Sequence, residues 1–377
     1  MKILVVIPTL SYGGAERLLV TLLPKLKDKG IEVKVCTLSG PLDLAQELEK
    51  EGISVVNLKL KHRWSMFEAL LKLHKEVKKF NPDIAWGHLY FGILYSRLIS
   101  VMFPRLKVVS VLHYNISSDS VKKGLWYSFR NWIFDKSQRI DFSTVAVSNS
   151  VKIDYEKFFG WQTIEVVFNA LDLQKIDNSI DDINRNSYRK MYDIPDDGFL
   201  IVLPGRLHES KGHKYLIKAV ESMKKQYGLM PKVIIAGEGS YRNEIENMIT
   251  KLELDSQFIL TGNLQQTELF KIMKISDIII IPSLFEAFGI AAIEAMYMQK
   301  PVIVTNIDGL NEITTNDMDT IHVPVKNSNA IGSALIKLIK DKKLVKRLSH
   351  NAKQTASKYD ANLIVKQWID IFESRKN

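Results

Sequence analysis

Short apolar runs alternate with longer stretches of helical period, and this alternation limits the possible folds more than any other feature of the chain. Runs rich in Val, Ile and Leu have the length of strands at 3–7, 33–37, 55–58, 83–86, 108–112, 199–203, 232–236, 258–260, 278–281 and 302–304. Helix-like stretches lie between many of them, for example at 15–29, 66–79, 214–227 and 268–274. Uniformly apolar strands are typical of parallel sheets that helices cover on both faces. The alternation therefore predicts an α/β fold with doubly wound sheets and right-handed crossovers.

The alternation restarts once, after a polar stretch at 172–197 that is rich in Asn and Asp. We interpret this stretch as an interdomain connection with an irregular entry into a second domain. The length of 377 residues also fits two domains of about 150 residues each. We predict a Rossmann-like N-terminal domain at 1–170, a second Rossmann-like domain at 171–358, and a C-terminal helix at 359–377 that packs back toward the first domain. Because ligands bind beyond the carboxyl ends of parallel strands, the site is expected in a cleft between the domains.

The remaining composition excludes several classes of protein. Cys36 is the single cysteine, so we exclude an internal disulfide and a cysteine zinc cluster, and expect a packed core thiol. Pro8 interrupts the N-terminal apolar run too early for a signal-peptide core, and no apolar run reaches the ~20 residues of a membrane-spanning helix. We expect a cytoplasmic protein.

Positive charge is concentrated in the N-terminal half. Residues 1–170 contain 24 Lys and Arg against 16 Asp and Glu, whereas the remaining residues are nearly balanced. This asymmetry suggests that the N-terminal half meets something anionic. Nucleic acid, an anionic membrane and phosphorylated small molecules all fit.

Glycines and cations gather in the loops that follow the predicted strands. Gly13 and Gly14 follow the first strand and open a helix, which leaves backbone N–H groups able to bind phosphate or carboxylate. In the second domain Arg206 and Lys211 follow the first strand, where a guanidinium fork and an ammonium group are suited to a diphosphate. Gly237 follows the next strand and adds another tight turn.

The segment 282–296 is the most informative one in the chain. A buried strand ends at Pro282, Glu286 follows in a loop, and an Ala- and Met-rich helix begins near Gly289 and carries Glu294. Carboxylates accept hydrogen bonds from sugar hydroxyls, and the free N–H groups of a helix start, together with nearby cations, hold phosphate. The combination indicates a sugar nucleotide.

These segments resemble the family-4 glycosyltransferases of the GT-B fold. The E-x7-E spacing from Glu286 to Glu294 lies within P-S-L-F-E-A-F-G-I-A-A-I-E-A-M. The other matching segments are G-R-L-x3-K-G at 205–212, A-G-E-G at 236–239, G-G-A-E-R at 13–17, and K-P-V-I-V-T followed by D-G-x2-E at 300–312. They occur in the expected order over nearly the whole chain. The sequence departs from the family pattern at Ala170, Gln299, Asp308 and Asn311, and three of these positions usually hold a turn glycine.

The resemblance implies a retaining, metal-independent hexosyltransferase that uses a UDP- or GDP-linked sugar and needs no cofactor. It implies that Glu286 contacts the donor sugar, that Glu294 contacts the ribose, and that Arg206 and Lys211 hold the diphosphate. His113, in the segment V-L-H-Y, matches the histidine that these enzymes place beside the transferred sugar. The positions assigned to donor binding through turns and helix ends are Gly13, Gly14, Gly205, Gly237, Phe288, Gly289 and Ile290.

No residue stands out as a covalent nucleophile, so we favour front-side attack on the donor sugar. The arginine, the lysine and the helix start would then neutralise the leaving phosphate in place of a metal ion. The pair Asp317 and Asp319 has the spacing of a metal-binding D-x-D motif. It lies in a polar segment far from the other motifs, so we expect no metal site.

The acceptor is expected to be a saccharide or a polyprenyl-diphosphate-linked saccharide of cell-surface glycan assembly. Residues 122–139 combine five cations with five aromatic rings, and on a helix Leu125, Phe129, Trp132 and Ile133 would share one face. Such a helix could lie on an anionic membrane surface at the inner face of the plasma membrane. Alternatively, it could pack into the N-terminal core.

Three other functions remain open at this point. A sugar-nucleotide epimerase of the same fold would bind a donor and transfer nothing. A nucleic-acid-binding protein fits the positive N-terminal half, but the chain contains no recognisable RNA- or DNA-binding module, so we expect no nucleic-acid partner. A catalytically silent scaffold is disfavoured because both glutamates and both diphosphate cations are present.

Overall fold

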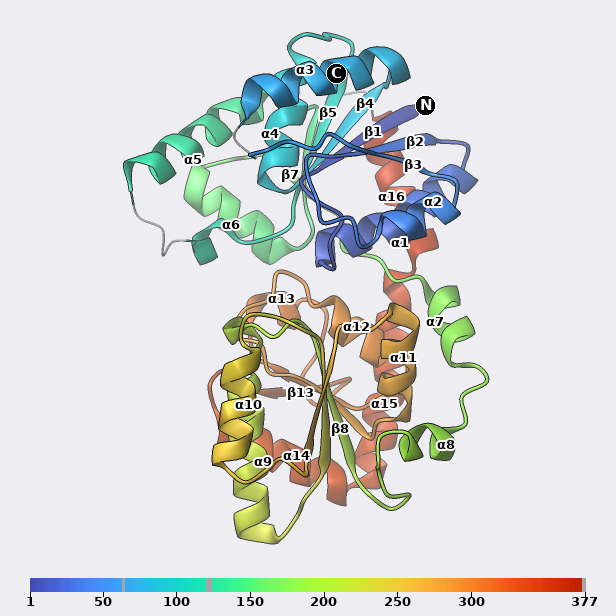
Figure 1. Cartoon of the computed structure of the whole chain (residues 1–377), viewed down its shortest axis with the longest axis vertical. Helices are drawn as coiled ribbons and strands as arrows, with labels where there is room; N and C mark the ends of the chain where they lie inside the picture. The colour runs from blue at the N-terminus through green and yellow to red at the C-terminus, as the bar shows by residue number, and fades with distance from the viewer. Residues whose placement is uncertain (63–64, 120–123, 375–377) are drawn as a thin grey trace. The chain divides into compact units, whose positions relative to one another are not determined.

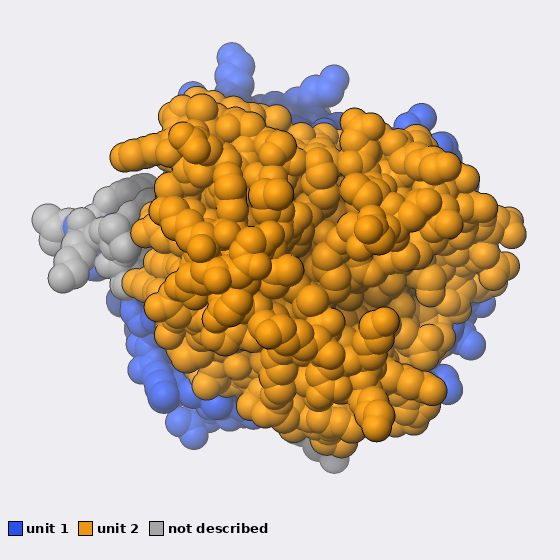
Figure 2. All heavy atoms as spheres, turned by 90° about the horizontal axis from the view of Figure 1, so that it is seen from below, with its two compact units in different colours: residues 1–170, 361–377 blue, residues 171–360 orange. Residues whose placement is uncertain are grey.

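The computed structural model describes residues 1–62, 65–119 and 124–374, and the chain divides into two compact units (Figure 2). Unit 1 contains Met1–Ala170 together with the segment that begins at Ala361, and unit 2 contains Leu171–Asp360. Each unit is built on one parallel sheet with helices on both faces (Figure 1). The predicted α/β class with two doubly wound Rossmann-like units is confirmed.

The sheet of unit 1 has the strand order β3-β2-β1-β4-β5-β6-β7. Its strands are β1 (Lys2–Ile7), β2 (Glu32–Thr37), β3 (Ser54–Asn57), β4 (Ile84–His88), β5 (Lys107–Leu112), β6 (Ser143–Ala146) and β7 (Ile164–Val166). Its helices are α1 (Gly14–Asp28), α2 (Ala45–Lys50), α3 (Met66–Phe80), α4 (Leu89–Ser100), α5 (Leu125–Ser137), α6 (Asn149–Phe159) and α16 (Ala361–Glu373). Strand β1 lies inside the sheet between β2 and β4 and is buried from Ile3 to Ile7, which explains its uniformly apolar sequence.

The sheet of unit 2 has the strand order β10-β9-β8-β11-β12-β13. Its strands are β8 (Leu200–Pro204), β9 (Lys232–Ala236), β10 (Phe258–Gly262), β11 (Ile278–Ile281), β12 (Val302–Thr305) and β13 (Ile321–Val323). Its helices are α7 (Leu173–Ile180), α8 (Arg185–Lys190), α9 (His213–Tyr227), α10 (Arg242–Lys251), α11 (Gln266–Ile275), α12 (Ile290–Tyr297), α13 (Asp308–Asn311), α14 (Ser328–Lys340) and α15 (Lys342–Ala356). In Figure 1, α9, α10 and α14 cover one face of this sheet, and α11, α12 and α15 cover the other.

The irregular entry expected at 172–197 is wrong, because this stretch forms α7 and α8. Both helices begin with a side-chain cap, in which Asp172 accepts from the Lys175 amide and Asn184 accepts from the Ser187 amide. In α7 only Ile176 and Ile180 are buried, and two apolar positions give too weak a period to recognise. The sequence prediction also missed β6, β7 and β13, which are three or four residues long and partly polar.

Helix α16 belongs to unit 1 although it ends the chain. Its buried face includes Trp368 and Phe372, whose rings lie 4.8 and 5.1 Å from the indole of Trp86 in β4. The helix thus packs against the sheet of unit 1 through aromatic contacts. Cys36 is fully buried and its pKa is raised to about 12 by desolvation, so the packed core thiol is confirmed. Within the described residues, no helix is long and apolar enough to span a membrane.

Candidate active site

In each sheet the strand order reverses at one place, the topological switch point. Doubly wound folds bind their ligands there, beyond the carboxyl ends of the strands. In unit 1 the chain adds β2 and β3 on one side of β1, and then β4 and the later strands on the other side. The loops after β1 and β4 therefore lie at the switch point. In unit 2 the corresponding loops follow β8 and β11. The loop after β8 carries Arg206 and Lys211, and the loop after β11 carries Glu286. The sequence motifs therefore lie where this fold binds ligands.

Close backbone contacts lock the loops of unit 2 together. A Cβ atom at Gly212 would collide with the carbonyl oxygen of Pro282, and Gly212 also has a φ of +71°. A Cβ atom at Gly237 would collide with the carbonyl oxygen of Gly205, and one at Gly309 with that of Glu286. Glycine at these positions thus lets the loops after β8, β9, β11 and β12 approach one another. This contact explains why the sequence motifs place glycines there.

Lys211 and Glu286 meet at the switch point of unit 2. The Lys211 Nζ lies 2.5 Å from Glu286 Oε1, and the Ser283 hydroxyl donates to the same oxygen at 2.9 Å. The main chain joins the two loops as well, because the Leu284 amide donates to the Ser210 carbonyl at 2.7 Å. Both charged side chains are partly exposed. A ligand at this edge would therefore meet an ammonium and a carboxylate side by side.

Glu294 lies one turn inside α12 and is only 6% exposed. Its Oε1 accepts a hydrogen bond from Gln266 Nε2 at 3.3 Å, which links it to the start of α11. Helix α12 begins at Ile290 after Gly289, whose φ is +100°. Phe288 is buried with its ring 5.5 Å from that of Tyr359, so its side chain is not available to a ligand.

Arg206 is exposed. Its neighbours are fixed, since the amides of Gly205 and Leu207 donate to the carbonyls of Ala236 and Glu238. The backbone is therefore held while the guanidinium remains accessible. This arrangement suits a side chain that closes on an anionic group.

The turn after β1 lies next to the carboxylate of Glu16. A Cβ atom at Gly13 would collide with the carboxylate of Glu16, which is 6% exposed and accepts from the hydroxyls of Thr9 and Ser11, each at 3.4 Å. Glu16 lies in the first turn of α1, where a negative charge is stabilised by the helix dipole. The carboxylate of Glu16 therefore lies beside the turn at which Gly13 and Gly14 are predicted to bind the donor, and that role stays a prediction. The signal for Glu16 was present in G-G-A-E-R.

His113 follows β5 and lies against a second histidine that sequence reasoning missed. Its Nε2 lies 2.9 Å from Nδ1 of His88, the last residue of β4. Burial lowers the pKa of His113 to about 3. A neutral imidazole therefore lies near the switch point of unit 1.

At Gln299 and Asp308, where the sequence departs from the family pattern, the backbone accommodates a residue other than glycine. Gln299 has a φ of +57°, so the turn keeps the left-handed conformation that glycine favours. Asp308 is the exposed first residue of α13, and the close approach at this loop is made by Gly309.

The D-x-D pair has structural partners. The Asp319 carboxylate is buried and accepts from the Thr315 amide at 2.7 Å and from the Thr355 hydroxyl at 2.9 Å. Asp317 pairs with Lys337 at 3.2 Å. In the part of the chain that the structure describes, no group of three His, Cys, Asp or Glu residues has a geometry suited to a metal ion.

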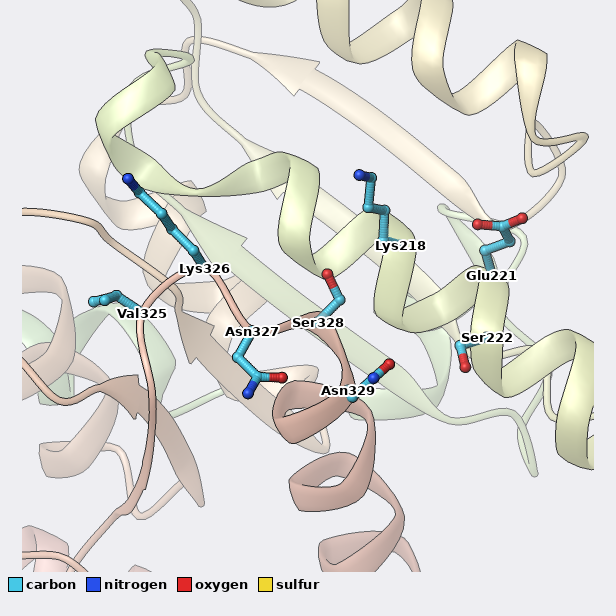
Figure 3. A pocket seen from close by; sticks show the side chains of 8 residues that line it. All are labelled: Lys218, Glu221, Ser222, Val325, Lys326, Asn327, Ser328 and Asn329. Carbon is cyan, nitrogen blue, oxygen red and sulfur yellow. The ribbon is translucent and has the colours of Figure 1, made fainter.

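A polar hollow of about 670 Å³ lies elsewhere in unit 2 (Figure 3). It is lined by Lys218, Glu221, Ser222, Val325, Lys326, Asn327, Ser328 and Asn329. The first three come from α9, and the others come from the loop after β13 and the start of α14. It contains none of the residues predicted to bind the donor.

The basic aromatic segment is a helix with two different faces. In α5, Phe134 is buried with its ring 4.9 Å from that of Tyr90, so this side packs into the core. Phe129 and Trp132 are 50% and 57% exposed and stack on each other with ring centroids 6.1 Å apart. The side chains of Leu125 and Trp126, and residues 122–123, lie outside the described part of the chain. The core-packing interpretation thus holds for Phe134, and the membrane-surface interpretation of the exposed aromatic pair stays a prediction.

Comparisons with known proteins agree with this geometry. The family model described as Glycosyltransferase Family 4 matches residues 12–175, and the model described as Glycosyl transferases group 1 matches residues 184–355. The crystal structure of Anabaena Alr3699/HepE in complex with UDP-glucose has a TM-score of 0.86 and 19% identity, and each chain is covered completely.

Two curated relatives show how far the similarity extends. A Campylobacter jejuni protein is 23% identical over 390 residues, covering 100% of this chain and 99% of the relative. It is named GalNAc-alpha-(1->4)-GalNAc-alpha-(1->3)-diNAcBac-PP-undecaprenol alpha-1,4-N-acetyl-D-galactosaminyltransferase. An uncharacterized glycosyltransferase of Methanocaldococcus jannaschii is 28% identical over 232 residues, which span 61% of this chain and 59% of the relative.

The two parallel-sheet units and the two matched models define a glycosyltransferase. The models match consecutive parts of the chain, and the chain belongs to the family-4 type of GT-B glycosyltransferases. The resemblance, the GT-B fold and glycosyl transfer are thereby confirmed. The roles of the individual site residues, the stereochemistry and the independence from metal stay predictions.

Proposed function

We propose that this chain transfers a hexosyl group, with retention and without a metal ion, from a UDP- or GDP-linked sugar to a saccharide or polyprenyl-diphosphate-linked acceptor. The observation that carries the proposal is the contact of Lys211 with Glu286 at the switch point of unit 2. The names of the relatives support the two substrates: HepE was crystallised with UDP-glucose, and the Campylobacter enzyme is named for an undecaprenol-linked saccharide.

Different side chains of unit 2 would bind different parts of the donor. Glu286 accepts hydrogen bonds from the sugar hydroxyls, and Glu294 does the same for the ribose. Arg206 and Lys211 neutralise the diphosphate, which gains negative charge as the bond to the anomeric carbon breaks. The backbone of Gly205, Gly237, Gly289 and Ile290 completes the site, and His113 is proposed to lie near the sugar.

The acceptor hydroxyl would attack from the side on which the nucleotide leaves. The bond between the anomeric carbon and the β-phosphate oxygen breaks, and a bond to the acceptor oxygen forms. The proton of the acceptor hydroxyl passes to the leaving phosphate oxygen, so no protein base is needed. Because the new bond forms on the face from which the nucleotide leaves, the anomeric configuration is retained.

A panel of nucleotide sugars tests donor binding by thermal shift. At 100 times its Kd the correct donor stabilises the folded chain by about 2.7 kcal/mol, which for a unit of this size raises Tm by about 5–10 °C. Lys211→Met should lose most of this shift, because it removes the ammonium proposed to hold the diphosphate. Lys218→Met is the matched control and should keep the shift, since Lys218 lines the separate hollow. A panel in which no nucleotide sugar raises Tm would contradict the proposal.

Release of nucleoside diphosphate separates transfer from epimerisation. With the donor identified above, a transferase releases the diphosphate faster when a saccharide acceptor is added. An epimerase converts the donor sugar and its rate does not respond to the acceptor. Chromatography of the nucleotide pool with and without acceptor measures the difference.

We also propose that α5 places unit 1 on an anionic membrane at the inner face of the plasma membrane. Phe129 and Trp132 form its exposed aromatic pair, and Lys136 and Arg139 are exposed one and two turns further on. A basic residue near such a surface contributes about 1 kcal/mol. Insertion of the aromatic rings would supply further binding energy.

Vesicle flotation tests the membrane proposal. At low salt the chain should float with vesicles that contain an anionic phospholipid and stay behind with neutral vesicles. The double variant Phe129→Ser/Trp132→Ser should weaken partitioning by at least about tenfold, equal to 1.4 kcal/mol. Phe67→Ser is the matched control, because Phe67 is 78% exposed on α3. Protein that remains unbound to anionic vesicles at low salt would contradict the proposal.

A further inference from the structure

Two histidines of unit 1 come together because their strands are neighbours. Strands β4 and β5 run parallel, and His88 at the end of β4 is in register with Val111 of β5. His113 follows β5 directly, so its ring reaches the ring of His88. The ring centroids lie 5.2 Å apart, and Nδ1 of His88 lies 2.9 Å from Nε2 of His113. The distance is that of a hydrogen bond between the two imidazoles.

The ring of His88 is fixed by its surroundings. It is 0% exposed and makes an edge contact with Trp86, with ring centroids 4.7 Å apart. Trp86 is itself fully buried and is held by the aromatic residues Trp368 and Phe372 of α16. His113 as a whole residue is only partly buried. The pair thus consists of one anchored, fully buried histidine and one that is only partly buried.

Both rings are neutral at pH 7. Burial is the main cause that lowers the pKa of His88 well below its usual range, and the neighbouring His113 lowers it further. Burial also lowers the pKa of His113 to about 3. Each neutral imidazole has one N–H donor and one bare acceptor nitrogen. The hydrogen bond between them therefore requires one ring to donate and the other to accept.

The second nitrogen of His88 decides which ring donates. Within the described residues, the buried Nε2 of His88 has no hydrogen-bond partner. If His113 donated, the proton of His88 would lie on this nitrogen, and an unpaired buried N–H costs about 1–3 kcal/mol. If His88 donates from Nδ1, its Nε2 is a bare acceptor, and buried acceptors without a partner are less rare in proteins than buried N–H groups without one.

We propose that His88 is a positioning residue, whose Nδ1–H donates to Nε2 of His113 and thereby holds the proton of His113 on Nδ1. In water the proton of a histidine side chain prefers Nε2, so the pairing selects the less common tautomer. The Nδ1 of His113 then offers an N–H group and no base. Resting on the proposed function, this donor would bind an oxygen of the sugar or of the leaving phosphate.

The tautomer of His113 can be measured directly by NMR on the full chain labelled with ¹⁵N-histidine, without substrate, at pH 7.5. His113→Gln identifies the signals of His113. We expect the proton on Nδ1 in the wild-type chain, and a shift to mainly Nε2 in His88→Phe, which keeps a ring against Trp86 and loses the donor. His88→Asn should keep the wild-type tautomer, because its amide can donate from nearly the same place. A wild-type proton on Nε2, or an unchanged tautomer in His88→Phe, would overturn the proposal.

Kinetics provide the second readout. His88→Phe should lower kcat about 100-fold, the loss expected when a group is displaced from its productive geometry, with little change in the KM of the donor. His88→Asn should recover most of the loss. Wild-type kcat in His88→Phe would overturn the positioning role. Because the NMR measurement needs no substrate, a chain that transfers no sugar counts against the proposed function, whereas an unshifted His113 proton counts against His88.

Discussion

Lys211→Met is expected to lower kcat for glycosyl transfer about 10²- to 10³-fold, the loss typical of removing one group that stabilises developing charge. The Lys211 ammonium lies 2.5 Å from Glu286 Oε1. When the donor binds, the ammonium would pair with the diphosphate, and Glu286 would turn its oxygens to the sugar hydroxyls. The substitution removes the charge that balances the leaving phosphate, and it leaves Glu286 with the Ser283 hydroxyl as a partner. Steady-state transfer with saturating donor measures the effect.

Stability separates this chemical effect from damage to the fold. A partly exposed ion pair contributes about 0–1 kcal/mol, so the Tm of Lys211→Met should stay close to that of the wild type. Lys211→Arg keeps the positive charge and should retain part of the activity. Lys218→Met makes the same substitution outside the proposed site and should transfer sugar at the wild-type rate. A Lys211→Met chain with unchanged kcat would show that the ammonium has no part in the chemistry.

The strands with uniformly apolar sequences could be predicted because both of their faces are buried. Ile278–Ile281 is an example, since all four residues of β11 lie in the core. The short strands at the far edge of each sheet could not, because they carry residues such as Thr144, Glu165 and His322. Helix α7 escaped prediction for a related reason, as only two of its residues are buried.

The glycine motifs were informative because glycine is needed where the backbones of two loops come into contact. Gly212, Gly237 and Gly309 each leave room for a carbonyl group of another loop. A requirement of this kind tolerates one residue type, so it is visible in the sequence. Gln299 shows the limit of the inference, because the turn keeps its left-handed φ of +57° without glycine.

The contacts between functional side chains could not be predicted from spacing. Lys211 and Glu286 lie 75 positions apart, and the sequence analysis assigned them to different parts of the donor. Only the folded loops show that the two side chains contact each other. His88 had no local signal, because its role depends on the neighbouring strand that places His113 beside it.

Arg97→Met is expected to destabilise unit 1 by about 3–5 kcal/mol, the usual effect of breaking a buried ion pair. The side chains of Arg97 and Asp141 are 0% and 1% exposed, and the guanidinium binds both carboxylate oxygens, at 2.8 and 2.7 Å. Arg97 also donates to the Phe134 carbonyl and the Ser137 hydroxyl of α5. Its loss leaves a buried carboxylate without its countercharge and removes two anchors of the helix that we propose to lie on the membrane. Thermal unfolding should show a decrease in Tm of about 6–20 °C for the transition of unit 1.

A double variant distinguishes the unpaired charge from the lost packing. Adding Asp141→Leu to Arg97→Met removes the carboxylate, so about 1–3 kcal/mol should be recovered. Arg139→Met is the surface control, because Arg139 is exposed and bonds only the Lys136 carbonyl among the described residues, and its Tm should stay near that of the wild type. If Arg97→Met and the double variant unfold at the same temperature, the stabilisation lies in the stacking of the guanidinium, 4.7 Å from the Phe134 ring, and the ion pair contributes little. Flotation of Arg97→Met with anionic vesicles then tests whether the stability of unit 1 and its membrane binding are linked. Fewer molecules should float, because an α5 released from its anchors should lose the fixed orientation of Phe129 and Trp132.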